Sequence, residues 1–468
     1  MTQADPSNPY LSGNFAPLDV ETELADLPVR GEIPRALHGV LFRNGPNPHF
    51  PPAPEKYHWF TGDGMLHAFR IEDGRVGYRN RWVRTPRWQL EAAAGRNLFS
   101  GFDPRERDPS VMDQDGGVAN TNIVWHAGRL LALEEAHLPT EIDPATLETK
   151  GYRDFGGTLN APFTAHPKFD PVTGEMVFFG YGAAGPLSPA MVHGTVSAKG
   201  ELTRLERFQA PFASMVHDFM VTQHHVLFPI LPLTGNMMRA LRGGPPFAWE
   251  PEKGAHIGVL RRGRPIEEMR WFHGPACYVF HPMNAWEADG RIIADVMQYD
   301  VAPLFPNPDG SRIDQTQAKA RLARWVFDLD GASDAFTSEY IDDLPGEFPR
   351  FDERRSGLSY RHGYFAAMRE GKSLSGSYDT LVHIDHRTGK RLRWDAPSGD
   401  AASEPVFVPR TAMAEEGDGW LLALLYRGAE QLSDLAVFEA GDIAAGPIGT
   451  ARLPHRVPFG FHGNFMPL

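Results

Sequence analysis

Four histidines lie within or directly after apolar segments, a setting that is typical of buried strands. They are His166 in FTAHPKFD, His217 in ASMVHDFM, His281 in CYVFHPMNAWE and His462 in FGFHGNF. A buried neutral imidazole needs a hydrogen-bond partner or a metal ion. Each histidine taken alone fits a hydrogen-bonded core residue, so the argument for a metal depends on whether the four side chains meet.

The composition restricts the metal chemistry that this chain can perform. The sequence has 19 histidines and one cysteine, Cys277, which excludes internal disulfides and a cysteine-rich metal site. Cys277 lies in an apolar run and is expected to be an inert core thiol. Four neutral imidazoles suit a borderline divalent transition metal such as iron, zinc or copper, and not magnesium or calcium.

Such a site keeps the full charge of the cation, so carboxylates are expected to hold the second ring nitrogen of the histidines. Three glutamates lie within or beside apolar sequence, where an unpaired carboxylate would be costly. The candidates are Glu135, Glu353 and Glu404. The alternative for each of them is a salt bridge at the surface.

Short strands joined by tight turns must position these residues. Gly (47) and Pro (41) are spread along the chain, and there is no long linker or low-complexity run, which favours a single domain over residues 1–468. Glycine-containing turns separate apolar or β-branched runs at Asp73-Gly74, Ala127-Gly128, Thr173-Gly174, Lys199-Gly200, Asp289-Gly290, Thr388-Gly389 and Asp418-Gly419. Helical periodicity is restricted to short pieces near Met237–Leu241 and Gln315–Leu322.

Repeated hairpins over a chain of 468 residues predict an all-β fold and, specifically, a β-propeller. Seven blades would have about 67 residues each, which is enough for four strands and their loops. The four histidines are separated by 51, 64 and 181 positions. Equivalent positions on inner strands recur once per blade and face the central axis. This arrangement explains how ligands so distant in sequence can meet at one ion.

The charge and the apolar segments exclude other classes of protein. The net charge of −13, from 46 Lys+Arg and 59 Asp+Glu, argues against nonspecific nucleic-acid binding. No apolar run is long enough for a spanning helix. The segment Met1–Tyr10 is polar and lacks the apolar core of a signal peptide, so the protein is expected to be cytoplasmic.

Several motifs, in one order along nearly the whole chain, resemble the carotenoid cleavage oxygenase family. The resemblance is to its bacterial branch, which includes lignostilbene dioxygenases and isoeugenol monooxygenase. The motifs are GEIPRALHGVLFRNGPNP (31–48), HWFTGDGMLHAF (58–69), VANTNIVWHAGRLLALEE, TAHPKFDPVTGEM, VHDFMVT, VFHPMNAWE, EPVFVPR and FHGNF.

The resemblance implies a seven-bladed propeller, with loops and short helices capping its metal-containing face. It implies one non-haem Fe(II) per chain, with four histidine ligands backed by three glutamates: His166, His217, His281 and His462, and Glu135, Glu353 and Glu404. The methyl group of Thr121 is implied to crowd one vacant coordination position and to leave another for O2. The implied reaction cleaves a conjugated C=C bond with O2 into two carbonyl products, without an added reductant.

The substrate pocket departs from that of the lignostilbene enzymes. Their Phe, Tyr and Lys, which bind a phenol ring, align with Trp59, Phe102 and Glu134. A glutamate cannot hold a phenolate as a lysine does, so the sequence favours an apocarotenoid or carotenoid. A stilbenoid or phenylpropanoid of the lignostilbene or isoeugenol type is the alternative, and the sequence leaves open whether one or both oxygen atoms enter the products.

The stretch Pro232–Pro251 combines Met237, Met238 and Leu241 with basic residues. It predicts a weak peripheral contact with a membrane surface, and the alternative is a packed lid over the propeller. A non-enzymatic propeller that serves as an interaction module is the alternative from another functional class, and it predicts no bound metal. A calcium-dependent propeller lactonase would require carboxylate and amide ligands in place of imidazoles. The sequence leaves the oligomeric state open.

Overall fold

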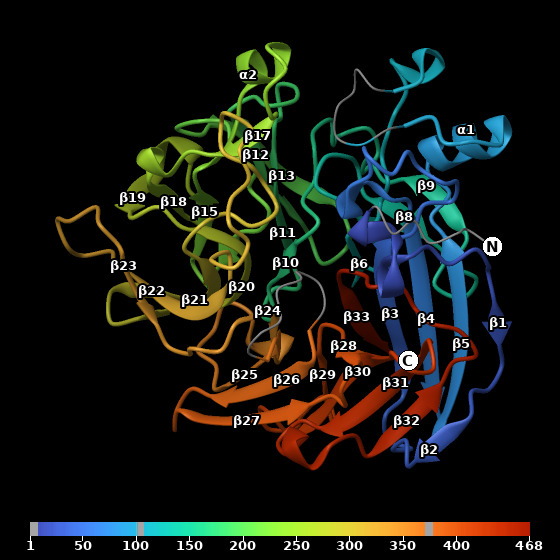
Figure 1. Cartoon of the computed structure of the whole chain (residues 1–468). Helices are drawn as coiled ribbons and strands as arrows, with labels where there is room; N and C mark the ends of the chain where they lie inside the picture. Colours follow the sequence, from blue (N-terminus) through green and yellow to red (C-terminus); the bar gives the residue numbers. More distant parts are fainter. Residues whose placement is uncertain (1–7, 100, 102–106, 370–377) are drawn as a thin grey trace. The chain divides into compact units, whose positions relative to one another are not determined.

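The computed structural model describes residues 8–99, 101, 107–369 and 378–468. The chain divides into two compact units. Unit 1 comprises Met1–Gly156 and Leu392–Leu468, and unit 2 comprises Gly157–Arg391. In Figure 1, unit 1 contains the blue and the red ends of the chain, and unit 2 runs from green to orange. The single-domain organisation expected for residues 1–468 stays a prediction.

Unit 1 contains three sheets within its described residues, all with antiparallel pairing. The first follows the order β1 (Glu23–Leu24), β5 (Arg75–Trp82), β4 (Gly64–Glu72), β3 (Gly39–Pro46) and β33 (Gly463–Pro467). The second follows the order β6 (Asn122–His126), β7 (Arg129–Leu133), β8 (Thr140–Ile142) and β9 (Thr149–Tyr152). The third follows the order β2 (Val29–Gly31), β32 (Gly449–Arg452), β31 (Leu432–Glu439), β30 (Gly419–Arg427) and β28 (Ala401–Ala402), and β29 (Val406–Pro409) also pairs with β30.

The described residues between 168 and 395 contain four sheets of four strands and one ribbon of two. The first sheet has β10 (Lys168–Phe169), β11 (Met176–Tyr181), β12 (Ala190–Val196) and β13 (Leu202–Gln209). The second has β14 (Met220–Val221), β15 (His225–Ile230), β18 (Ala255–Arg261) and β19 (Arg270–Gly274). The third has β20 (Tyr278–Ala288), β21 (Arg291–Tyr299), β22 (Arg321–Asp328) and β23 (Thr337–Tyr340). The fourth has β24 (Gly346–Phe351), β25 (His362–Ala367), β26 (Thr380–Asp385) and β27 (Lys390–Asp395), and the ribbon has β16 (Leu233–Gly235) and β17 (Phe247–Trp249).

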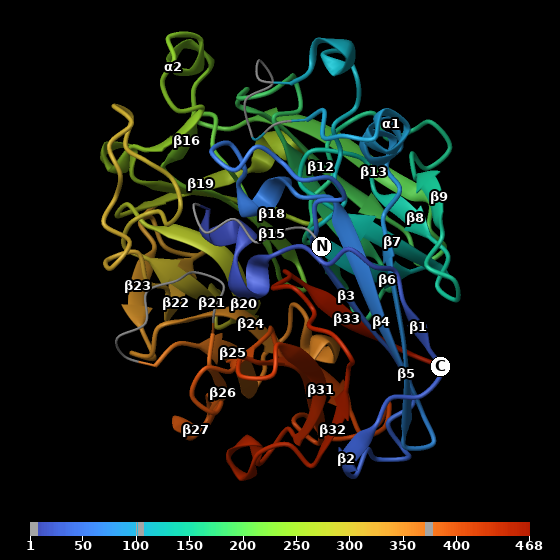
Figure 2. The same cartoon turned by 45° about the vertical axis from the view of Figure 1, so that its right-hand side comes forward.

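Segments from the two ends of the chain share one sheet of unit 1. Strand β33 pairs antiparallel with β3, with Gly39 opposite Pro467 and Arg43 opposite Gly463. Figure 2 shows the two strands side by side. Position 463 requires a glycine, because an added Cβ would come within 2.3 Å of the Phe42 carbonyl oxygen. The close contact of these backbones fixes the position of His462, the residue before β33.

Turn residues define the hairpins as the sequence predicts. Asp73 and Gly74 connect β4 to β5, and Ala127 and Gly128 connect β6 to β7. Asp73, Ala127 and their glycines all have positive φ, between 49° and 78°, which is the geometry of the turns that join twisted antiparallel strands. Alternating burial along β5 shows that one face of its sheet packs inside.

Two α-helices occur in the described residues, α1 (Pro86–Ala94) and α2 (Met237–Leu241). Helix α2 confirms the predicted helical piece. The prediction of a helix at Gln315–Leu322 is wrong, because the Asp314 side chain accepts from the backbone N–H of Thr316 in a turn and β22 begins at Arg321. Helix α1 was not predicted, although Thr85, Pro86 and Gly95 supply an N-cap, a proline at the first turn and a left-handed C-cap.

The remaining helical segments are single 3₁₀ turns. They are η1 (Pro9–Leu11), η2 (Gly13–Phe15), η3 (Trp59–Thr61), η5 (Pro109–Val111), η6 (Pro251–Lys253), η7 (Ile266–Glu268), η8 (Glu353–Arg355) and η9 (Ile443–Ala445). Among the described residues, no helix has both the length and the apolar character needed to cross a bilayer.

Candidate metal centre

Three imidazoles of unit 2 meet at their Nε2 atoms. Nε2 of His217 lies 3.1 Å from Nε2 of His166 and 3.1 Å from Nε2 of His281. The three residues are at most 9% exposed. One ring nitrogen takes part in only one of these hydrogen bonds, because it has either one proton or one lone pair. At most one of the two N···N contacts can therefore be a well-directed hydrogen bond, whereas a cation between the nitrogen atoms would accept a lone pair from each ring.

Each of these histidines lies at or just before the first strand of a sheet. His166 precedes β10, His217 precedes β14, and His281 lies within β20. The pairing of β20 with β21 shifts between Val279 and Pro282, so His281 sits in a β-bulge. A bulge redirects side chains at the end of a ladder. This local irregularity turns the His281 ring toward the other two rings.

A buried carboxylate holds the second nitrogen of His281. The His281 Nδ1–H donates to Glu347 Oε2 at 2.5 Å, and the backbone N–H of Phe348 donates to the same oxygen at 2.7 Å. Glu347 is 3% exposed. With its proton on Nδ1, the neutral imidazole has its lone pair on Nε2, which is the atom that faces His217. Glu347 is not among the residues that the sequence predicted.

The prediction that Glu353 backs a histidine is wrong. Glu353 lies in η8, its side chain is 54% exposed, and it forms an ion pair with Arg350. Both glutamates occur in the segment GEFPRFDE. The pairing of β24 with β25 shifts between Glu347 and Arg350, and Phe348 has a φ of 55°, so regular strand alternation does not apply there.

His462 of unit 1 has the same kind of support. Its Nδ1–H donates to Glu404 Oε1 at 2.8 Å. The second carboxylate oxygen accepts from Arg43 Nη1 and from the backbone N–H of Gly463, each at 2.9 Å. Arg43, Glu404 and His462 are all buried. Glu404 was predicted from the sequence, and Arg43 was not. The Glu404 carboxylate balances the buried charge of Arg43.

Thr121 and Trp59 lie near His462 within unit 1. The backbone N–H of His462 donates to the carbonyl oxygen of Thr121 at 3.1 Å. The Thr121 hydroxyl donates to Asn120 Oδ1 at 2.9 Å. The Trp59 ring contacts Phe461, the neighbour of His462, with centroids 4.4 Å apart. Together with Phe15, these rings form an aromatic cluster.

Glu134 belongs to a charged network that the sequence did not predict. It accepts hydrogen bonds from the backbone N–H groups of Val118 (2.7 Å) and Ala119 (3.2 Å), and it lies 3.1 Å from His137 Nδ1. Burial lowers the pKa of His137, but the Glu134 carboxylate more than compensates and raises it to about 9. His137 is therefore charged at neutral pH, and this position contains both signs of charge.

The sequence also predicted Glu135 and Phe102 as site residues. Glu135 is half-buried just after the end of β7, and its role behind a histidine stays a prediction. Phe102 lies outside the described residues.

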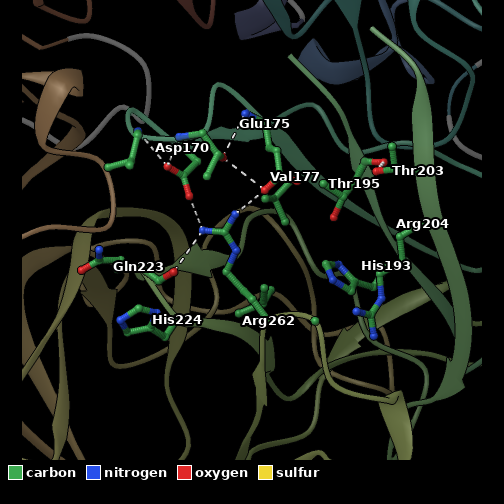
Figure 3. Close-up of a pocket in the computed structure, with 14 residues that line it drawn as sticks. Asp170, Glu175, Val177, His193, Thr195, Thr203, Arg204, Gln223, His224 and Arg262 are labelled. Carbon is green, nitrogen blue, oxygen red and sulfur yellow. Dashed lines mark hydrogen bonds and ion pairs between the residues drawn. The ribbon is translucent and has the colours of Figure 1, made fainter. Parts of the chain in front are cut away.

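Unit 2 has a cavity of about 460 Å³ that the clustered histidines do not line. Figure 3 shows Arg262 at its centre, between Asp170 and Glu175. Arg204, on the same wall, pairs with Glu206. The cavity includes none of the three clustered histidines, and the charges of Arg262 and Arg204 are paired, so it offers no metal or anion site.

Comparisons with known proteins extend over the whole chain. A family model described as retinal pigment epithelial membrane protein (RPE65) matches residues 15–467. The chain is 40% identical over 475 residues to an isoeugenol monooxygenase from Pseudomonas putida, an alignment that covers 99% of both chains.

Two solved structures are also similar. The crystal structure of a lignostilbene dioxygenase from Pseudomonas brassicacearum superposes with a TM-score of 0.95 and 36% identity over 99% of both chains. A cobalt-substituted apocarotenoid oxygenase from Synechocystis superposes with a TM-score of 0.86 and 30% identity over 97% of both. The similarity confirms the predicted fold class, an all-β seven-bladed propeller, and the seven sheets of four or more strands in the described residues are its blades. The chain belongs to the RPE65 family of carotenoid cleavage oxygenases, a family of enzymes that cleave alkenes.

Proposed function

We propose that His166, His217, His281 and His462 hold one Fe(II) ion per chain, and that the enzyme uses it to cleave a conjugated C=C bond with O2. The observation that carries the proposal is the meeting of three of these imidazoles in unit 2, where Nε2 of His217 lies 3.1 Å from Nε2 of His166 and 3.1 Å from Nε2 of His281. Neutral imidazoles suit a divalent transition metal. The cobalt-substituted relative supports a metal of this kind.

Iron at this position would activate O2 for addition across the alkene, which gives two carbonyl products and requires no external reductant. The protein residues keep the ligands in place and exclude water. Glu347 and Glu404 fix the orientation and the tautomer of His281 and His462. We assign the same role to Glu135. The methyl group of Thr121 would narrow one coordination position, and the aromatic cluster around Trp59 would form an apolar wall for a flat conjugated substrate.

For the substrate, we propose a conjugated aryl alkene of the phenylpropanoid or stilbenoid class. In the sequence, Glu134 takes the place of a lysine, and this replacement disfavoured phenolic substrates. His137, charged at neutral pH and 3.1 Å from Glu134, supplies a cation to the same position. The identity of 40% to an isoeugenol monooxygenase supports this class. An apocarotenoid is the second candidate, favoured by the similarity to an apocarotenoid oxygenase and by the absence of the lysine itself.

The test is anaerobic reconstitution with ferrous iron, followed by O2 and a panel of propenylphenols, hydroxystilbenes and apocarotenoids. We expect one substrate class to give aldehydes in amounts that depend on iron. The His281→Ala variant should lose both bound iron and product, and His273→Ala, which changes an exposed histidine of β19, should keep both. Full activity in His281→Ala would disprove the ligand assignment.

We also propose that the exposed side chains of α2 rest on a membrane surface. Met237, Met238 and Leu241 are 43%, 57% and 62% exposed. Arg239 does not belong to a basic flank, because it pairs with Glu250 and donates to carbonyl groups of its own loop. Co-sedimentation with vesicles should fall several-fold in a Met238→Ser, Leu241→Ser variant that keeps full activity on a water-soluble substrate. Equal binding by both proteins would contradict the proposal.

A further inference from the structure

An ion pair between the half-buried Lys168 and the buried Asp218 of unit 2 lies next to the histidine cluster. Lys168 Nζ is 2.7 Å from Asp218 Oδ1 and 2.9 Å from Oδ2. The Asp218 side chain is 3% exposed, and its Oδ1 also accepts from the backbone N–H of Phe219 at 2.6 Å. The Lys168 ammonium lies over the Phe219 ring, 5.8 Å from its centroid. Both charges are thus held at defined positions.

Asp218 directly follows His217, but its carboxylate faces another histidine. Asp218 Oδ2 lies 3.8 Å from His166 Nδ1. This is an ion-pair distance and is too long for a hydrogen bond. By comparison, Glu347 and Glu404 lie 2.5 and 2.8 Å from the Nδ1 atoms of His281 and His462. Lys168 Nζ contacts Asp218 Oδ2, which is the same oxygen that lies 3.8 Å from His166 Nδ1.

We propose that Asp218 is a further carboxylate of the metal centre, and that Lys168 is a positioning residue that draws its charge away from His166. The proposal rests on the proposed iron site. Asp218 contributes a negative charge that stabilises a cation among the histidines, and Lys168 reduces that contribution. The pair sets how strongly the site holds a divalent ion, and it does so from outside the coordination sphere.

Opposite effects of the two residues distinguish this role from a merely structural ion pair. Asp218→Asn removes the negative charge at nearly constant shape and should weaken the binding of Co(II) about tenfold. Lys168→Met leaves the carboxylate uncompensated and should strengthen binding several-fold. Lys168→Arg, which keeps the positive charge, should restore the wild-type value, and the double variant should bind Co(II) with an affinity between those of the single variants.

The experiment is a titration of the apoprotein with Co(II) against a competing chelator, with the visible Co(II) bands recorded at saturation. We expect Lys168→Met to shift these bands, because the loss of its cation changes the electrostatic field of Asp218 at the histidines. Lys150→Met is the matched control, since Lys150 pairs with Asp143 on the exposed surface of unit 1. It should leave both affinity and spectrum unchanged.

Two failures are distinguishable. If the wild-type protein does not bind Co(II), the proposed metal site and this inference both fail. If the wild type binds Co(II) but Asp218→Asn and Lys168→Met weaken binding in the same direction and to the same extent, the pair is only structural. In that case the inference is overturned and the metal site stands.

Discussion

The carboxylate behind His281 shows how far a single residue can be assigned from sequence. Apolar neighbours and the need to balance charge predicted Glu353, whereas the carboxylate on His281 is that of Glu347, six positions earlier. The irregular pairing of β24 and the positive φ of Phe348 bury Glu347 and leave Glu353 in solvent. The positive φ falls on a phenylalanine and not on a glycine, so the residue type does not reveal it, and Pro349 is the only sequence signal of an irregular strand at the shift.

This assignment predicts different outcomes for two equivalent substitutions. Glu347→Gln should lower metal affinity by about 10- to 100-fold, because the amide cannot accept the His281 Nδ1–H as a carboxylate does. Glu353→Gln should leave it unchanged, since Glu353 pairs with Arg350 at the surface. Chelator competition with the purified variants measures both effects. A larger loss in Glu353→Gln than in Glu347→Gln would reverse the assignment.

At the scale of elements, local turn chemistry was easier to predict than helices. Gly74 and Gly128 mark their hairpins because left-handed turn geometry favours glycine there. The segment after Asp314 has a helix-like composition, but its residues from Arg321 onward pair with β21. Tertiary pairing overrode the local propensity, a result that no short window of sequence contains.

The ion pairs in Figure 3 join two neighbouring sheets of unit 2 and should stabilise it. Arg262 follows β18 and is 16% exposed, whereas Asp170 and Glu175 flank the hairpin between β10 and β11. Arg262→Met leaves the buried Asp170 without its cation and should lower the free energy of unfolding by about 3 kcal/mol.

Urea denaturation measures this effect. The neighbouring Arg261→Met, which changes an exposed side chain, should cost less than about 0.5 kcal/mol. Equal stability of the two variants would contradict a structural role for the Arg262 ion pairs.

At the scale of the whole molecule, the composition limits which side chains can bind a metal ion, and strand pairing determines where those side chains lie. The count of one cysteine against 19 histidines excluded a thiolate site and left histidine or carboxylate as ligands before any element was placed. The turns predicted hairpins, but their assembly into seven sheets, with β33 beside β3, depends on long-range pairing. That pairing follows from burial over the entire chain and not from any motif.

Several histidines outside the metal centre are buried or half-buried, and they are neutral. Burial lowers the pKa to about 4 for His58, His193 and His383, and to about 3 for His67. In the unfolded chain these groups titrate near 6.5, so between 6.5 and 4 the unfolded state binds more protons. Their contribution to stability is complete above pH 6.5 and is lost as the pH falls toward 4.

The apoprotein should therefore unfold in mild acid. By pH 5, each of these histidines should lower the free energy of unfolding by about 2 kcal/mol relative to pH 7. Urea midpoints at the two pH values test this expectation. His67→Gln, which can keep a hydrogen bond to Tyr78, should make the fall shallower. Identical midpoints at pH 7 and pH 5 would show that these rings are not neutral and buried.

The pairing of β3 with β33 has a consequence for protein synthesis. Arg43 emerges from the ribosome early, yet the carbonyl of Phe461, to which its guanidinium donates, is 418 positions further along. At ordinary elongation rates, roughly 20 to 80 seconds separate the two. Throughout that time the nascent chain exposes the unpaired edge of β3. The sheet that contains β3 can therefore be completed only after β33 has been synthesised, and His462 reaches its place in that late step.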